Sequence, residues 1–239
     1  ADETFRRERT MYSKLHEPRA WLLPAALREL ADRSPGAPWL TDSEGASLTF
    51  GQALSDSRRA AGHFERLGVR RGDRVGIFMF NSCAFATAWL GLGHLAATAV
   101  FLNTELRASF LRHQLNDSAI QCIVVDAELV DALLAVADEA PQLRTVVVVG
   151  RRGDILAPAH WQVLDWPDWR DQPEWDGPGP APEDIACIMY TSGTRRPSKG
   201  VPVPRAHCAL YRVWGIECLQ LTQSDRYYVC LPLFHANGL

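Results

Sequence analysis

The chain has 239 residues, of which 47% are hydrophobic and 22% are charged, the balance of an ordinary soluble globular protein. This composition excludes a disordered chain, a collagen-like chain and a coiled coil as the main architecture. The formal net charge of −3 provides no global basic field, so no nucleic-acid partner is expected. No apolar run approaches the roughly 20 residues of a membrane span, which leaves only peripheral membrane association open.

The first 150 residues alternate short apolar runs with longer helical patterns. Apolar strands alternating with longer helices are typical of an α/β fold, in which helices cover both faces of a parallel sheet. The predicted helices cover residues 18–33, 51–67, 82–95, 105–116 and 128–138. The predicted strands cover residues 39–41, 48–50, 74–80, 98–102, 119–125 and 144–149.

Residues 151–183 interrupt this alternation. They contain six of the 15 prolines and four of the eight tryptophans. The Pro/Gly-rich part predicts a linker, and the tryptophans either pack a long loop onto its own domain or form a stacking platform. We therefore expect a first α/β subdomain over 1–150, a linker over 151–183, and the start of an incomplete second α/β subdomain over 184–239.

The segment with most chemical content follows the linker. An apolar strand is predicted over 184–190, followed by a loop over 191–200 and a helix over 206–219. A loop rich in Ser, Thr and Gly can present backbone N–H groups and hydroxyls to one anion, and Lys199 adds a point charge suited to a polyphosphate. Because Gly200 follows the lysine, this is not a Walker A loop, and a plain solvated turn remains an alternative.

Two motifs of this region resemble a known family. The stretch YTSGTRRPSKGV, from Tyr190 to Val201, is similar to the phosphate-binding signature (Y/F)-T-S-G-T-T-G-x-P-K-G-V of the adenylate-forming superfamily. That superfamily includes acyl-CoA synthetases, luciferases and peptide-synthetase adenylation domains. The stretch LPLFHANG, from Leu231 to Gly238, resembles the family motif P-L-F-H-x-x-G. Residues 81–113 resemble acyl-CoA ligases of the fatty-acid-transport and carnitine-CoA type.

The resemblance covers most of residues 20–239 and implies a fold, a reaction and a set of ligands. The implied fold is the N-terminal portion of the large domain of such a ligase, with parallel sheets flanked by helices. In the implied reaction a small-molecule carboxylic acid and ATP form acyl-AMP and pyrophosphate, and coenzyme A then displaces AMP. Mg²⁺ would bridge phosphate oxygens of ATP.

The resemblance also implies roles for single residues. His235 would be the catalytic residue that orients the acid's carboxylate, and Asn237 and Gly238 would line the same pocket. The β- and γ-phosphates of ATP would be held by Thr191, Ser192, Gly193, Thr194, Lys199 and Gly200. The histidines on predicted helices, His63, His94 and His113, are assigned to packing.

The sequence departs from the family pattern at four positions and in length. Arg195 and Arg196 replace a Thr and a Gly, Ser198 replaces a Pro, and Arg205 stands where the family tends to place a His. The family's chains are much longer, so we expect a truncated N-terminal part that cannot complete the reaction alone. The alternative is a non-catalytic nucleotide-binding relic or regulatory fragment.

Cysteine usage bears on the compartment. Six cysteines are present, and none belongs to a C-x-x-C pair. His207 and Cys208 are adjacent but lack the second ligand pair that a zinc site needs, so no metal site is expected. The pattern is typical of reduced, buried thiols and predicts a cytoplasmic protein.

Overall fold

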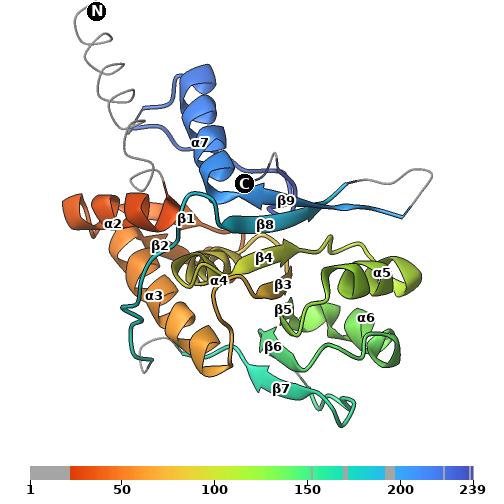
Figure 1. Cartoon of the computed structure of the whole chain (residues 1–239). Helices are drawn as coiled ribbons and strands as arrows, with labels where there is room; N and C mark the ends of the chain where they lie inside the picture. The colour runs from red at the N-terminus through yellow and green to blue at the C-terminus, as the bar shows by residue number, and fades with distance from the viewer. Residues whose placement is uncertain are drawn as a thin grey trace, which may run out of the picture.

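The computed structural model describes residues 22–151, 153–168, 172–191, 197–222, 224–236 and 238. Its strands are β1 (Pro38–Thr41), β2 (Ser47–Thr49), β3 (Arg74–Phe78), β4 (Thr98–Phe101), β5 (Cys122–Asp126), β6 (Thr145–Val149), β7 (Gln162–Asp165), β8 (Ile185–Tyr190) and β9 (Gly200–Pro204). Seven of them form one sheet in the order β7-β6-β5-β3-β4-β8-β9 (Figure 1). Neighbouring strands of this sheet are parallel, except that β9 is antiparallel to β8. Strands β1 and β2 form a separate antiparallel hairpin.

Helices cover both faces of the sheet, as an α/β fold requires. The longer helices are α2 (Leu23–Arg33), α3 (Phe50–Arg66), α4 (Cys83–His94), α5 (Ala108–Ser118), α6 (Val130–Leu134) and α7 (Arg205–Leu219). Figure 1 shows α3 and α4 on one side of the sheet and α5 and α6 on the other. None of the helices in the described ranges combines the length and apolar character that a bilayer span requires.

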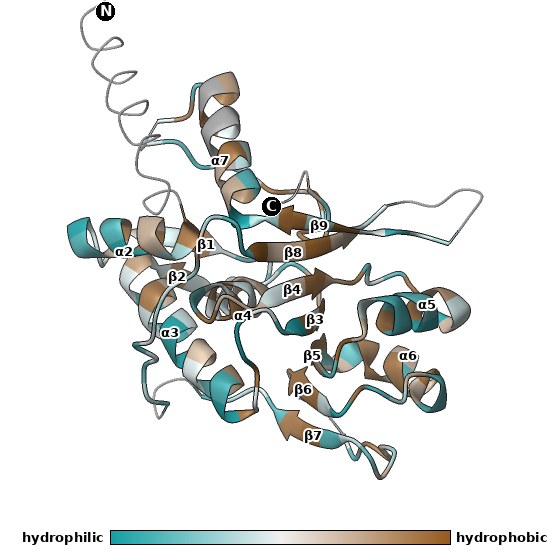
Figure 2. Ribbon diagram, viewed as in Figure 1, coloured by the Kyte–Doolittle hydropathy of each residue, from teal (hydrophilic) through white to brown (hydrophobic). Residues whose placement is uncertain are grey.

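The strands divide their side chains between two cores. In β5, Cys122 and Val124 belong to the core under α3 and α4, whereas Ile123 and Val125 belong to the core under α5 and α6. This alternation follows from the two-residue period of a strand. Since both faces are covered, the inner strands are mainly apolar, and brown predominates in β5, β6 and β8 in Figure 2.

Local capping sets where the helices begin. Thr49 Oγ1 accepts the Gln52 amide at 3.2 Å, and Gln52 Oε1 accepts the Thr49 amide at 2.9 Å, so the two residues form a capping box. Helix α3 therefore starts at Phe50, which we had predicted as the last residue of a strand. The predicted helix over 128–138 is broken into α6 and two short 3₁₀ segments, Ala127–Leu129 and Ala137–Glu139.

The stretch between 151 and 183 differs from the expected linker. It contains β7, which pairs in parallel with β6. Further along, the Trp175 amide donates to Arg58 O at 3.0 Å, and Arg58 Nε donates to Trp175 O at 3.0 Å, which fastens the chain to α3. Trp161 is buried and Trp166 packs against the core, as expected for packing tryptophans; Trp169 lies outside the described residues.

Strand β8 pairs with β4 within the same sheet. Residues 185–204 therefore extend the first sheet rather than open a separate one, and the subdomain boundaries we expected from the sequence remain a prediction. The thiols also differ in part from expectation: all six cysteines are free, but only Cys122 and Cys187 are buried, and Cys218 and Cys230 are exposed.

Candidate functional site

The two sequence motifs meet at one edge of the sheet. Strands β3, β4 and β8 run parallel, so their carboxyl ends lie at the same edge, where open α/β sheets bind their ligands. Thr191 directly follows β8, and Asn81 lies three residues beyond the end of β3. Strands β3 and β8 are separated only by β4, so their ends lie about 10 Å apart at the usual strand spacing.

The predicted phosphate loop closes a hairpin between β8 and β9. The Thr191 amide donates to Lys199 O at 3.1 Å, and the Lys199 amide donates to Thr191 Oγ1 at 3.4 Å. These contacts bring together two of the predicted phosphate-binding residues, which are eight positions apart in the chain. Ser192, Gly193 and Thr194 lie outside the described residues, as do Arg195 and Arg196, so their predicted roles remain predictions.

Gly200 has a packing role that the motif did not reveal. A Cβ at this position would lie 2.9 Å from Ile188 Cγ2 and 3.3 Å from Tyr190 Cζ. Glycine therefore allows β9 to approach the Tyr190 ring closely. The Tyr190 hydroxyl donates to Asp117 Oδ2 at 2.7 Å, and burial, together with this carboxylate, raises the pKa of Tyr190 well above its usual value.

Helix α5 holds the lysine side of the loop. His113 Nε2 donates to Ser198 O at 2.8 Å, and Gln114 Nε2 donates to Ser198 Oγ at 3.1 Å. The sequence predicts a packing role for His113 and no role for Gln114, so these contacts with the loop are a finding of the structure. The one signal in the sequence is Ser198 itself, because a serine provides a side-chain acceptor where the family pattern has proline. The contact fixes the residue next to Lys199.

The His235 segment is held by Asn81. Asn81 Nδ2 donates to Leu231 O at 2.9 Å, and the Leu233 amide donates to Asn81 Oδ1 at 2.8 Å. Phe234 is buried in the core under α4, whereas His235 is exposed. The buried phenylalanine and the asparagine together fix the segment at the carboxyl end of β3 and leave the imidazole accessible to a ligand.

The end of this segment forms a tight turn. The Gly238 amide donates to His235 O at 2.9 Å, and a Cβ on Gly238 would lie 2.3 Å from Pro232 O. Any side chain here would require the backbone to move. Gly238 also lines a cavity, and its role in binding substrate remains a prediction; Asn237 lies outside the described residues.

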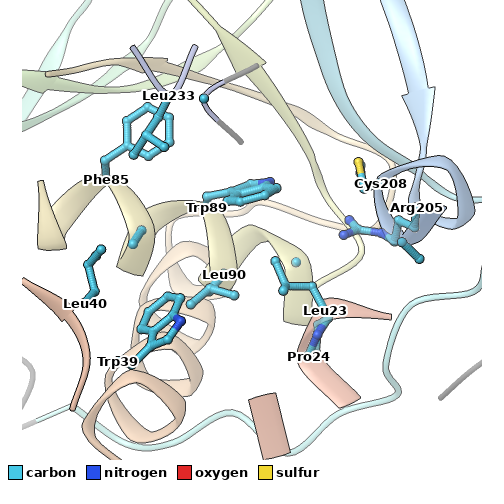
Figure 3. A pocket seen from close by; sticks show the side chains of 15 residues that line it. Leu23, Pro24, Trp39, Leu40, Phe85, Trp89, Leu90, Arg205, Cys208 and Leu233 are labelled. Carbon is cyan, nitrogen blue, oxygen red and sulfur yellow. The ribbon is translucent and has the colours of Figure 1, made fainter. Parts of the chain in front are cut away.

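That cavity has a volume of about 260 Å³ and lies between α2, β1, α4, α7 and the His235 segment (Figure 3). Most of its wall is apolar, and Arg205 is the only charged residue among those that line it. The largest apolar side chains of the wall are Leu23, Trp39, Phe85, Trp89, Leu90 and Leu233.

A partly buried carboxyl group supports the same edge. Asp126 Oδ2 accepts the Phe80 amide at 2.7 Å, next to Asn81. Burial raises the pKa of Asp126 to about 6, although the hydrogen bond from Phe80 acts in the opposite direction. Asp126 therefore changes its charge close to neutral pH beside the residue that holds the His235 segment.

Comparison with known proteins identifies the family. The AMP-binding enzyme family matches residues 27–239. Long-chain fatty acid transport protein 1 of Mus musculus is 30% identical over 222 residues, covering 90% of this chain and 34% of its own length. Long-chain-fatty-acid–CoA ligase FadD13 of Mycobacterium tuberculosis is 29% identical over 220 residues, covering 89% of this chain and 41% of its own length.

A solved structure leads to the same conclusion. The anthranilate CoA ligase AuaEII, in complex with anthranoyl-AMP, superposes with a TM-score of 0.76 at 27% sequence identity, covering 87% of this chain and 40% of that one. The chain thus belongs to the AMP-binding enzyme family and has the α/β fold of adenylate-forming ligases, which confirms the resemblance found in the sequence. It spans less than half the length of these relatives.

Proposed function

We propose that the chain binds ATP and a carboxylic acid as part of an ATP-dependent, AMP-forming acid–thiol ligase of the acyl-CoA synthetase type. The observation that carries the proposal is the meeting of the two motifs at one sheet edge. Thr191 and Lys199 face each other across the hairpin after β8, and Asn81 holds the His235 segment at the end of β3. A nucleotide and an acid bound at these two places would be neighbours.

The proposed chemistry has two steps. First, a carboxylate oxygen of the acid bonds to the α-phosphorus of ATP, and the bond from that phosphorus to the pyrophosphate oxygen breaks. Second, the sulfur of coenzyme A, having lost its proton, bonds to the acyl carbon, and AMP leaves. Such a phosphorus transfer needs positioning and charge stabilisation more than covalent help from the protein.

The residues at the edge suit these needs. The Lys199 ammonium can neutralise phosphate oxygens as a point charge. Because Thr191 Oγ1 already accepts the Lys199 amide, its own proton remains available to a phosphate oxygen. The accessible imidazole of His235 can orient the acid's carboxylate. The adjoining apolar cavity, whose wall includes Leu233 and Gly238, supports an acid with an apolar body.

Mg²⁺ belongs to the expected chemistry, and it usually binds one or two carboxylates together with substrate phosphates. In the ranges that the structure describes, no group of three or more His, Cys, Asp or Glu side chains could hold a metal ion. These residues do not form a cage for the ion, so no residue of this chain is assigned to it.

The free thiols are typical of a reducing compartment, which supports a cytoplasmic location.

Titration calorimetry with ATP·Mg²⁺ tests the proposal on Lys199→Ala. Charge-assisted hydrogen bonds contribute about 1.5–3 kcal/mol each, so the substitution should weaken binding by roughly tenfold to a hundredfold. The exposed Arg33→Ala on α2 also removes one positive charge and should leave the affinity unchanged. An affinity that is insensitive to Lys199→Ala would contradict the proposal. In a full-length version of the enzyme, ATP binding without ATP–pyrophosphate exchange for any acid would favour the non-catalytic alternative.

A further inference from the structure

The charged residue in the wall of the apolar cavity is unusual in its surroundings. Arg205 begins α7, and only 7% of it is exposed. Its Nη2 donates to Ala97 O at 2.7 Å, but Nε is buried without a hydrogen-bond partner among the described residues. No ion pair of Arg205 occurs in that part of the chain either, so a single backbone carbonyl partly satisfies a buried cation.

Such an arrangement is costly for the empty protein. A buried charge without a full set of partners loses its hydration, and burial lowers the pKa of Arg205, although the charge of Asp184 acts in the opposite direction. The guanidinium lies against α4, because a Cβ on Gly93 would be 3.7 Å from Nη1. Figure 3 shows it extending from α7 toward the Trp89 side of the cavity.

The wall of the cavity has two chemically different parts. Leu233 and Gly238, from the His235 segment, contribute one part of its wall, and Arg205 and Cys208, from α7, contribute another. The volume of about 260 Å³ lies just below the range of about 300–1,000 Å³ that is usual for small-molecule pockets. This size favours a compact ligand, and the buried donor favours a ligand with an oxygen acceptor.

We propose that the cavity selects acids that have a compact apolar body and a second acceptor oxygen, a ketone or a second carboxylate, which Arg205 binds. This inference rests on the proposed function, since it assigns the reacting carboxylate to the His235 side. It gives a role to an arginine in an otherwise apolar wall. It also gives a role to Arg205 as the residue that stands where the family tends to place a histidine.

The test is a tryptophan-fluorescence titration without nucleotide, which is possible because Trp39 and Trp89 line the cavity. The probes are octanoate, 7-oxooctanoate and octanedioate, which share a chain length and differ at the far end. A hydrogen bond to a charged group should make both acceptor-bearing acids bind roughly tenfold or more tightly than octanoate. Equal binding of the three acids, or no binding of any, would overturn the inference.

Two variants assign the preference to Arg205. Arg205→Met should abolish it, so that all three acids bind alike, and it should raise the unfolding temperature of the empty chain because a buried charge is removed. Arg205→Gln retains an amide donor, so it should keep the preference for 7-oxooctanoate and lose that for octanedioate. Arg33→Met, the same substitution at an exposed site, should change nothing. A preference that survives in Arg205→Met would also overturn the inference.

These outcomes are separable from those of the proposed function. The acid titration contains no ATP, and the Lys199→Ala titration contains no acid. If the acid preference fails while ATP binding depends on Lys199, only the inference about the acid falls. If the acid preference holds while ATP does not bind, the cavity remains a binding site and the ligase proposal falls.

Discussion

Asp126 provides a test at the scale of a single residue. Its pKa in the folded protein is raised to about 6, against about 3.9 in an unfolded chain. Between these values the folded state holds more protons than the unfolded state, so the free energy of unfolding falls as the pH rises through this window. The slope from one such group is at most about 1.4 kcal/mol per pH unit.

We expect Asp126→Asn to remove this fall in the free energy of unfolding, because the amide oxygen can still accept the Phe80 N–H without carrying a charge. Urea unfolding at pH 4 and pH 8 should show the variant gaining stability over the native chain as the pH rises. His94, whose pKa burial lowers to about 4, has the opposite pH dependence but is common to both proteins. A stability difference that does not vary with pH would refute this account of Asp126.

The sequence indicates candidate residues that belong to local motifs, but it does not indicate residues that act through contacts with distant segments. Thr191, Lys199 and His235 are candidates because local motifs contain them, and their roles remain predictions. Asn81 and Gln114 could not be predicted, since each acts on a segment 84 or more positions away, and no local pattern specifies that contact. Gly238 was predicted to line a pocket, and the motif did not reveal that it also packs against the backbone of Pro232.

At the scale of elements, α3 and α4 pack closely through a glycine. A Cβ on Gly91 would lie 2.8 Å from Ala60 Cβ and 3.2 Å from the Ala61 amide nitrogen. Gly91→Ala should therefore separate the helices and lower the free energy of unfolding by about 1–3 kcal/mol. Gly93→Ala, on the same helix, meets nothing closer than 3.6 Å and should be neutral or stabilising. Chemical denaturation of both variants checks this, and equal effects would contradict the packing argument.

The contact between α5 and the loop gives a second prediction at this scale. Gln114→Ala removes one hydrogen bond to Ser198, with a net value of about 0.5–1.5 kcal/mol. If that bond positions Lys199, the affinity for ATP·Mg²⁺ should fall roughly two- to tenfold. Gln142→Ala is a matched control, because Gln142 bonds to Leu115 O and Asn116 Oδ1 instead of the loop. Calorimetry showing equal affinities for the two variants would exclude a positioning role for Gln114.

Element boundaries show where sequence patterns lose precision. The apolar period predicted one helix over 128–138, but the backbone leaves helical geometry at Val136, with φ −121° and ψ 10°. The β8–β9 pairing was also unexpected, because prolines at 202 and 204 disfavour a strand interior. β9 lies at the edge of the sheet and tolerates them.

At the scale of the whole molecule, the alternation of strands and helices was sufficient to predict an α/β fold with a mainly parallel sheet. The order of the strands was not predictable, since the pairing of β4 with β8 joins segments more than 80 residues apart. The same pairing moves Thr191 to the edge where Asn81 holds the His235 segment. The candidate site is therefore a product of sheet order as much as of its motifs.

Hydrogen exchange with and without ATP·Mg²⁺ tests the central claim, that the nucleotide binds at the carboxyl edge of this sheet. We expect slower amide exchange in peptides covering 190–201 and 231–238, and no change in peptides covering 67–75, which lie at the opposite edge. Protection at that opposite edge, or no protection over 190–201 at saturating nucleotide, would contradict the claim.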